Sequence, residues 1–135
     1  MTQKIVISKS GKNAISETSP DNLIFSSDYN TLKYYSSGYV NVNYNENTGG
    51  TLTFYKGTVA HGLDYIPFFY TYVDIDSSGT FTPCPKLLSF MTINQSFYAY
   101  ADATNINFVC LMKGTSGSAS TAKFRYFIFK NKIDL

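Results

Sequence analysis

The sequence predicts an all-β protein, an antiparallel β-sandwich of about eight to ten short strands with jelly-roll or immunoglobulin-like topology. Three observations predict this fold. Apolar and polar residues alternate in short runs, turn-forming residues separate these runs, and no segment keeps a helical period over a dozen residues. With 135 residues the chain has the usual size of one domain, so we expect a single sandwich domain over residues 1–135.

The alternation is clearest in the segment Gly38–Tyr44 and again in Thr51–Ala60. The loop between them, Asn45–Gly50, ends in two glycines, which suit the positive φ of a hairpin turn. The loop Gly114–Ser120 holds only small residues, and we expect it to be mobile or wrapped by a partner. The segments with strand character are Gln3–Ser8, Leu23–Ser26, Thr31–Tyr35, Gly38–Tyr44, Thr51–Ala60, Tyr65–Ile75, Thr80–Thr82, Leu87–Ile93, Ser96–Ala101, Asn105–Met112 and Thr121–Lys130.

The segment Tyr65–Ile75 is the most apolar of these, which is typical of a central strand covered on both faces. Pro67 cannot donate a hydrogen bond to a ladder, so it should mark where this strand begins. His61 and Gly62 precede it and predict a structural turn, with Gly62 permitting the chain reversal and the His61 ring bonded to a backbone group.

A catalytic role for His61 is the alternative, with Asp64 or Asp74 orienting the ring and a serine as nucleophile. The sequence has no G-x-S-x-G elbow, and serine is so abundant that the three residue types coexist by chance. We therefore assign no catalytic residue and expect a protein that is not an enzyme.

The segment Asp74–Gly79 imitates the first half of a calcium loop, but Pro85 stands where the twelfth-position glutamate would be. A hairpin turn explains the same residues better. Asp74 and Asp76 could also face one side of a strand edge as paired carboxylates, and a weak structural cation stays open. We predict no metal site and no cofactor.

Charge and cysteine usage exclude several other classes. Eleven basic residues against nine acidic ones give a net charge of +2, and the basic residues are scattered, so we expect no nucleic-acid binding. No apolar stretch is long enough for a membrane span, and the N-terminus lacks a signal peptide. Cys84 and Cys110 are then expected to be reduced core residues.

Twelve tyrosines and a charged fraction of only 15% are the most unusual features. Tyrosine is enriched at protein interfaces, and exposed tyrosines also stack on sugars, although many tyrosines pack inside sheets. We take as a candidate interaction surface the cluster Tyr29, Tyr34, Tyr35, Tyr39, Tyr44 and Tyr55.

Two stretches resemble a known family. The first runs from Lys4-Ile5-Val6-Ile7-Ser8 through Ser19-Pro20-Asp21-Asn22-Leu23 to Lys33, and the second is the box His61-Gly62-Leu63-Asp64-Tyr65-Ile66-Pro67. Both are similar to segments of small virion structural proteins of tailed bacteriophages. Asp64 departs from the box, where a small turn residue often stands.

The resemblance implies a non-enzymatic structural role as a head-decoration, tail or fibre component. The expected partners are other virion proteins, with a homo-oligomer and a host-surface glycan as further expectations. The expected location is the virion, after synthesis in the host cytoplasm. The alternative function is a carbohydrate-binding module or a receptor-binding fibre tip.

Overall fold

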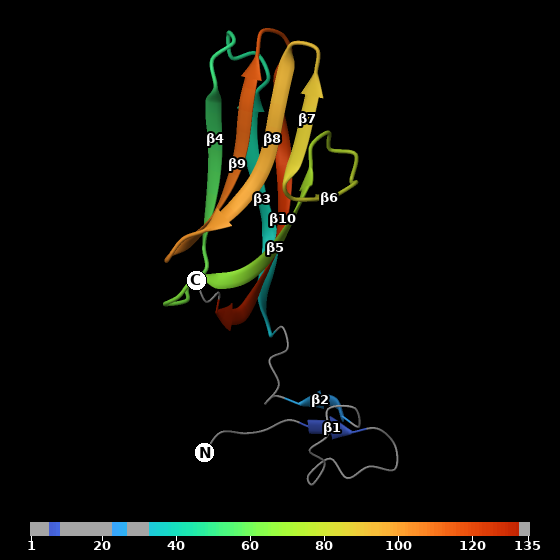
Figure 1. Ribbon diagram of the computed structural model, residues 1–135, viewed down its shortest axis with the longest axis vertical. Helices are drawn as coiled ribbons and strands as arrows, with labels where there is room; N and C mark the ends of the chain where they lie inside the picture. Colours follow the sequence, from blue (N-terminus) through green and yellow to red (C-terminus); the bar gives the residue numbers. More distant parts are fainter. Residues whose placement is uncertain (1–5, 9–22, 27–32, 133–135) are drawn as a thin grey trace. The chain divides into compact units, whose positions relative to one another are not determined.

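The computed structural model describes residues 6–8, 23–26 and 33–132 of the chain (Figure 1). The chain divides into two compact units, Met1–Leu32 and Lys33–Leu135. In the first unit, β1 (Val6–Ser8) pairs antiparallel with β2 (Leu23–Ser26). The second unit contains the rest of the described strands, and the prediction of one domain over residues 1–135 stays a prediction.

The second unit consists of two four-stranded antiparallel sheets, which confirms the all-β sandwich. Sheet I has the order β3-β10-β5-β6, and sheet II has the order β4-β9-β8-β7. No helix in the described part of the chain is long and apolar enough to cross a membrane. The strands are β3 (Tyr34–Asn45), β4 (Thr53–Ala60), β5 (Pro67–Asp74), β6 (Thr82–Pro83), β7 (Lys86–Phe90), β8 (Ile93–Ala101), β9 (Asn105–Gly114) and β10 (Ala119–Lys132).

The pairing is nested. Within the second unit the first strand, β3, pairs with the last, β10, and the second, β4, pairs with the second to last, β9. This nesting resembles a jelly roll, in which a long antiparallel hairpin is rolled up so that its two arms contribute to both sheets. The strands β7, β8 and β9 depart from it, because they follow one another as a meander within sheet II.

The core lies between the inner faces of the two sheets. Phe124 of sheet I contacts Phe108 of sheet II with ring centroids 5.3 Å apart, and both side chains are fully buried. Along β10 the buried residues alternate with others, so that every second side chain of this strand points into the core and the rest point outward. The remaining core residues are Val42, Tyr44, Val73, Phe97, Ile106, Cys110, Met112, Ala122 and Ile128.

Several strand boundaries shift by a few residues, and two predictions differ in kind. The predicted strands Thr31–Tyr35 and Gly38–Tyr44 merge into β3 over its described length. The predicted strand Leu87–Ile93 is instead a hairpin, because the chain turns at Met91, whose φ is 46°. A positive φ brings the Cβ of a residue other than glycine close to the following carbonyl oxygen, so methionine is not a residue that signals such a turn. The apolar pattern of this segment therefore gave no indication of it.

The loop Gly114–Ser120 differs as well, because its backbone is bonded within the fold. Glu46 donates its backbone N–H to the Ser118 carbonyl at 3.1 Å and accepts the Ser118 N–H on its carboxylate at 3.4 Å. The other carboxylate oxygen of Glu46 accepts a hydrogen bond from Gln95 at 2.9 Å. These bonds hold the β9–β10 hairpin against the end of β3.

Candidate functional site

His61 is buried in the turn between β4 and β5, with both ring nitrogens bonded to the backbone. The Leu63 N–H donates to Nδ1 at 3.1 Å, which places the ring proton on Nε2. Nε2 then donates to the Asp102 carbonyl at 3.0 Å. Gly62 follows with φ of 69°, and Pro67 is the first residue of β5. The ring therefore ties this turn to the β8–β9 turn, and its partners among the described residues include no serine hydroxyl.

The Asp102 side chain stabilises the β8–β9 turn through hydrogen bonds of its own. Its carboxylate accepts backbone N–H groups from Thr104 at 2.9 Å and Asn105 at 2.7 Å, and a side-chain N–H from Asn107 at 2.9 Å. These hydrogen bonds, the one from Asn107 most strongly, hold the pKa of Asp102 well below its usual range. A carboxylate held in this way caps a turn and is poorly suited to accept a proton.

The segment from Asp74 forms a turn, and its two carboxylates are used to close that turn. Asp74 Oδ2 accepts the Gly79 N–H at 2.9 Å, and Asp76 Oδ1 accepts the Ser78 N–H at 3.2 Å. The bonds from Ser78 lower the pKa of Asp76. Asp74 is 3% exposed, and its Oδ1 has no hydrogen-bond partner among the described residues. Within the described ranges, no three His, Cys, Asp or Glu side chains gather as a metal site would require.

Neither cysteine is in a disulfide, as the sequence predicts. Cys110 lies in the core, and its burial raises its pKa to about 12. Cys84 is half-buried beside the core, and burial raises its pKa too. Both thiols are therefore protonated and weak nucleophiles at neutral pH.

The tyrosines of the predicted interaction surface divide between the outside and the core. Tyr34 and Tyr39 are 61% and 51% exposed on β3, and Tyr35 lies with its hydroxyl beside Gly62. Tyr44 was predicted wrongly, because it is 3% exposed and packs edge-on against Phe97. Tyr55 also points inward and packs against the core. Tyr29 lies outside the described residues.

The outer face of sheet I, which points away from the core, is covered by aromatic side chains. They belong to β3, β5 and β10 and to the segment before β6, and two cations lie among them. We call this surface the aromatic face, and it consists of Tyr34, Tyr39, Phe68, Tyr70, Tyr72, Phe81, Phe127 and Phe129 with Lys123 and Arg125.

The rings of the aromatic face contact one another across neighbouring strands. Phe68, Tyr70 and Phe129 form a mutual cluster with centroid distances of 5.1, 6.0 and 5.9 Å. Tyr72 packs edge-on against Phe127 at 6.2 Å. Cross-strand aromatic pairs of this kind order the side chains before any partner arrives. The rings of the face therefore support one another, and Tyr70 among them remains 48% exposed.

The two cations of the aromatic face lie over its rings. Lys123 Nζ is 4.5 Å from the Tyr39 ring centroid, and the Arg125 guanidinium is 4.8 Å from that of Phe127. Within the described part of the chain neither cation has an acidic partner, since ring contacts are the only interactions of their charged groups. Asp74 is the cross-strand neighbour of Lys123, whereas Arg125 lies opposite Tyr39 and Tyr72, so Arg125 is the cation with no acidic residue opposite it.

Sequence analysis missed most of this face for one reason. The run Tyr65–Ile75 is predicted to be covered on both faces, but the described residues of the second unit cover only its inner face, and the outer residues Phe68, Tyr70 and Tyr72 are aromatic. Phe127 and Phe129 occupy matching outward positions on β10. The sequence does show aromatic residues at every second position in the segments that form β5 and β10. Only the pairing of these two strands brings the aromatic residues together on one face.

A polar pocket of about 340 Å³ adjoins the aromatic face at the Asp74 turn. The aromatic side of the pocket is Phe81, whose ring lies 6.0 Å from that of Tyr39. Its other lining residues are Asn41, Asp74, Ser77, Gly79, Thr121 and Lys123. Hydroxyl, amide and carboxylate groups beside a ring are the set that binds a polyol.

No protein-family model, no curated protein and no solved structure matches this chain.

Proposed function

We propose that this protein is a non-enzymatic structural component of a tailed-phage particle and that it binds another virion protein through the aromatic face. The observation that carries the binding role is this face of mutually packed, partly exposed rings with two cations stacked on them. Monomeric proteins rarely leave such contiguous aromatic surface to water.

The composition of the aromatic face favours a protein partner. Tyrosine, phenylalanine and arginine are the residues enriched at interfaces and at their energetic hot spots. Because Arg125 lies opposite Tyr39 and Tyr72 and has no acidic partner within the described residues, the partner should present Asp or Glu beside apolar side chains. An ion pair between this acidic residue and the aromatic face would set the orientation of the partner on the face and contribute to its affinity.

The same charges argue against a second copy of this chain on the aromatic face. A two-fold contact places one patch on its own duplicate, so the four cations of the two copies would enter one interface to which the aromatic face contributes no carboxylate. Opposed like charges cost several kcal/mol. The homo-oligomer expected from the sequence would therefore form through another surface.

The assignment to a phage particle rests on the family resemblance. Its second box, from His61 to Pro67, forms the bonded turn that leads into β5, the strand that carries Phe68, Tyr70 and Tyr72 of the aromatic face. Its first stretch lies mostly outside the described residues. The virion location and the synthesis in the host cytoplasm follow from this proposal.

Co-sedimentation with particles that lack this chain tests the proposal. The purified wild-type chain should sediment with them, and Tyr70→Ser and Arg125→Ala should each weaken binding by at least about tenfold, as truncation of interface anchors does. Leu87→Ser is the matched control, since Leu87 is 71% exposed on the outer face of sheet II and should bind like wild type.

Two results would count against the proposal. Binding that is unchanged in both variants of the aromatic face, or lost equally in Leu87→Ser, would remove the face from the interface. A hydrolytic turnover that disappears in a folded His61→Ala variant would contradict the non-enzymatic role.

Saccharide binding is the second candidate function, and the polar pocket at the Asp74 turn favours it. A hexose could stack on Phe81 while Asn41 and Thr121 bind its hydroxyls. Glycan-array screening should then find a ligand that Phe81→Ala loses and that Tyr70→Ser keeps. Absence of any bound glycan would leave the pocket without this function.

A further inference from the structure

Each sheet has a strand edge that its last strand covers only in part. β6 pairs only with Tyr72 and Val73 of β5, and β7 pairs with β8 only as far as Phe97. Among the described residues, no strand pairs with Pro67–Tyr70 on the side away from β10, or with Tyr98–Ala101 on the side away from β9. Figure 1 shows β7 beside only one half of β8.

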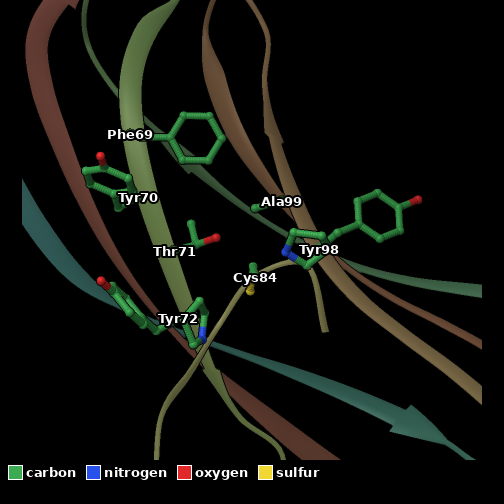
Figure 2. A pocket seen from close by; sticks show the side chains of 9 residues that line it. Phe69, Tyr70, Thr71, Tyr72, Cys84, Tyr98 and Ala99 are labelled. Carbon is green, nitrogen blue, oxygen red and sulfur yellow. The ribbon is translucent and has the colours of Figure 1, made fainter. Parts of the chain in front are cut away.

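A cavity of about 450 Å³ lies where these two uncovered edges face each other. Figure 2 shows Phe69 and Thr71 of β5 pointing toward Ala99 and Cys84, while Tyr70 and Tyr72 point to the other side of β5. We call this cavity the lateral slot, and its lining residues are Phe69, Tyr70, Thr71, Tyr72, Pro83, Cys84, Pro85, Tyr98 and Ala99.

The chain itself cannot extend β6 along the lateral slot. Cys84 donates its N–H to the Thr71 carbonyl at 3.0 Å, which is the last backbone bond on this edge of β5. Pro83 and Pro85 on either side have no N–H to give. The segment after Cys84 then crosses to sheet II as β7. The ladder on β5 therefore stops one step before Phe69.

The free edge presents backbone groups to the lateral slot. Since the Thr71 carbonyl points to this edge, the N–H and carbonyl of Phe69, two residues earlier, point the same way. No charged side chain lines the slot, and its only side-chain polar groups are the tyrosine and Thr71 hydroxyls and the Cys84 thiol. An apolar cavity beside an open strand edge matches an uncharged, extended peptide.

We propose that the lateral slot binds an extended, uncharged segment of a partner protein, which adds as a strand to the edge of β5 at Phe69. The backbone of the segment continues the line of β6, and one apolar side chain enters the slot against Phe69, Thr71 and Ala99. Every second residue of the segment points into the slot, so apolar residues at alternate positions define the ligand class. The slot shares Tyr70 and Tyr72 with the aromatic face, but the peptide would bind the backbone edge of β5 and the side of β5 that carries Phe69 and Thr71, so the proposal does not depend on docking through the aromatic face.

Titration calorimetry with a panel of capped heptapeptides tests the proposal. The peptides alternate threonine with valine, leucine or phenylalanine, and the best binder is remade in two N-methylated forms. One form carries the methyl groups on the odd peptide nitrogens, and the other carries them on the even ones. Only one set of N–H groups can face β5, so one form should lose at least about tenfold in affinity and the other should bind like the parent.

A variant locates the binding. Ala99→Leu fills the lateral slot and should abolish binding, whereas Ala103→Leu makes the same change at an exposed turn position and should not. Failure of every peptide to bind at millimolar concentration, or equal binding by both methylated forms, would overturn the proposal. An apolar dye that binds where no peptide does would do the same and would make the slot a small-molecule site. The methylation result stands even if Ala99→Leu does not fold.

Discussion

Replacing His61 by alanine should destabilise the fold through the loss of two specific hydrogen bonds. The His61 ring accepts the Leu63 N–H and donates to the Asp102 carbonyl, and the residue is 2% exposed. Each bond contributes about 1 kcal/mol, and the space left by a buried ring adds about 1 kcal/mol more. The free energy of unfolding should therefore fall by about 2–4 kcal/mol.

The measurement is equilibrium unfolding in urea, in which the midpoint should fall while the slope stays that of the wild type. His61→Asn is the matched comparison, because its side-chain oxygen can accept the Leu63 N–H but cannot reach Asp102. It should lose about half as much. A loss below about 0.5 kcal/mol in His61→Ala, the size of an ordinary surface change, would refute the structural role of this ring.

Three further predictions concern other parts of the sandwich. Because the pKa of Asp102 is lower in the folded state, the Asp102 carboxylate stabilises the fold at pH values above its usual pKa of about 3.9, and this stabilisation is lost as the pH falls through the lower folded value. Urea unfolding should therefore show Asp102→Asn less stable than wild type at neutral pH, with the difference in free energy of unfolding shrinking on acidification. Iodoacetamide with mass spectrometry should label Cys84 slowly in the native state and Cys110 only after unfolding. Gly57→Val should lower the free energy of unfolding by about 1–3 kcal/mol, since a Cβ at Gly57 would lie within 3.0 Å of the Val40 and Val42 side chains on β3. Gly49→Ala is the control and should destabilise the fold less, because a Cβ there meets open space and only the positive φ of Gly49 disfavours alanine.

The strands were predictable where one side of the alternation is apolar and the other polar. The segment Gly38–Tyr44 has Val40 and Val42 inside and Asn41 and Asn43 outside, and alternation alone assigns both faces. Tyr44 follows the same alternation into the core. The prediction that it lies on the surface was wrong, because it relied on the residue type, tyrosine, and not on the position of this residue in the alternation.

The aromatic face was not predictable in the same way, because both faces of β5 are apolar. Periodicity cannot tell Phe69, which packs against the core, from Phe68, which lies on the outer face. Only the pairing with β10 decides, since it places Phe129 and Phe127 beside Phe68 and Tyr72. That pairing joins residues about 60 positions apart in sequence, a distance over which local patterns carry no information.

The His61 turn falls between these cases. The sequence identifies a turn from Gly62 and Pro67, and it predicts that the ring is bonded to a backbone group. The identity of that group, the Asp102 carbonyl, depends on the β8–β9 turn lying beside the β4–β5 turn. The strand order β4-β9-β8 brings the two turns together, and no motif marks it.

Hydroxyl-radical footprinting of the chain, free and assembled on its particle, tests the central claim most directly. If the aromatic face is the docking surface, oxidation of Tyr39 and Tyr70 should fall on assembly, while Tyr100 and Phe54 on sheet II stay as reactive as in the free chain. Unchanged oxidation of Tyr39 and Tyr70 together with protection of Phe54 and Tyr100 would contradict the account and assign the contact to the opposite sheet.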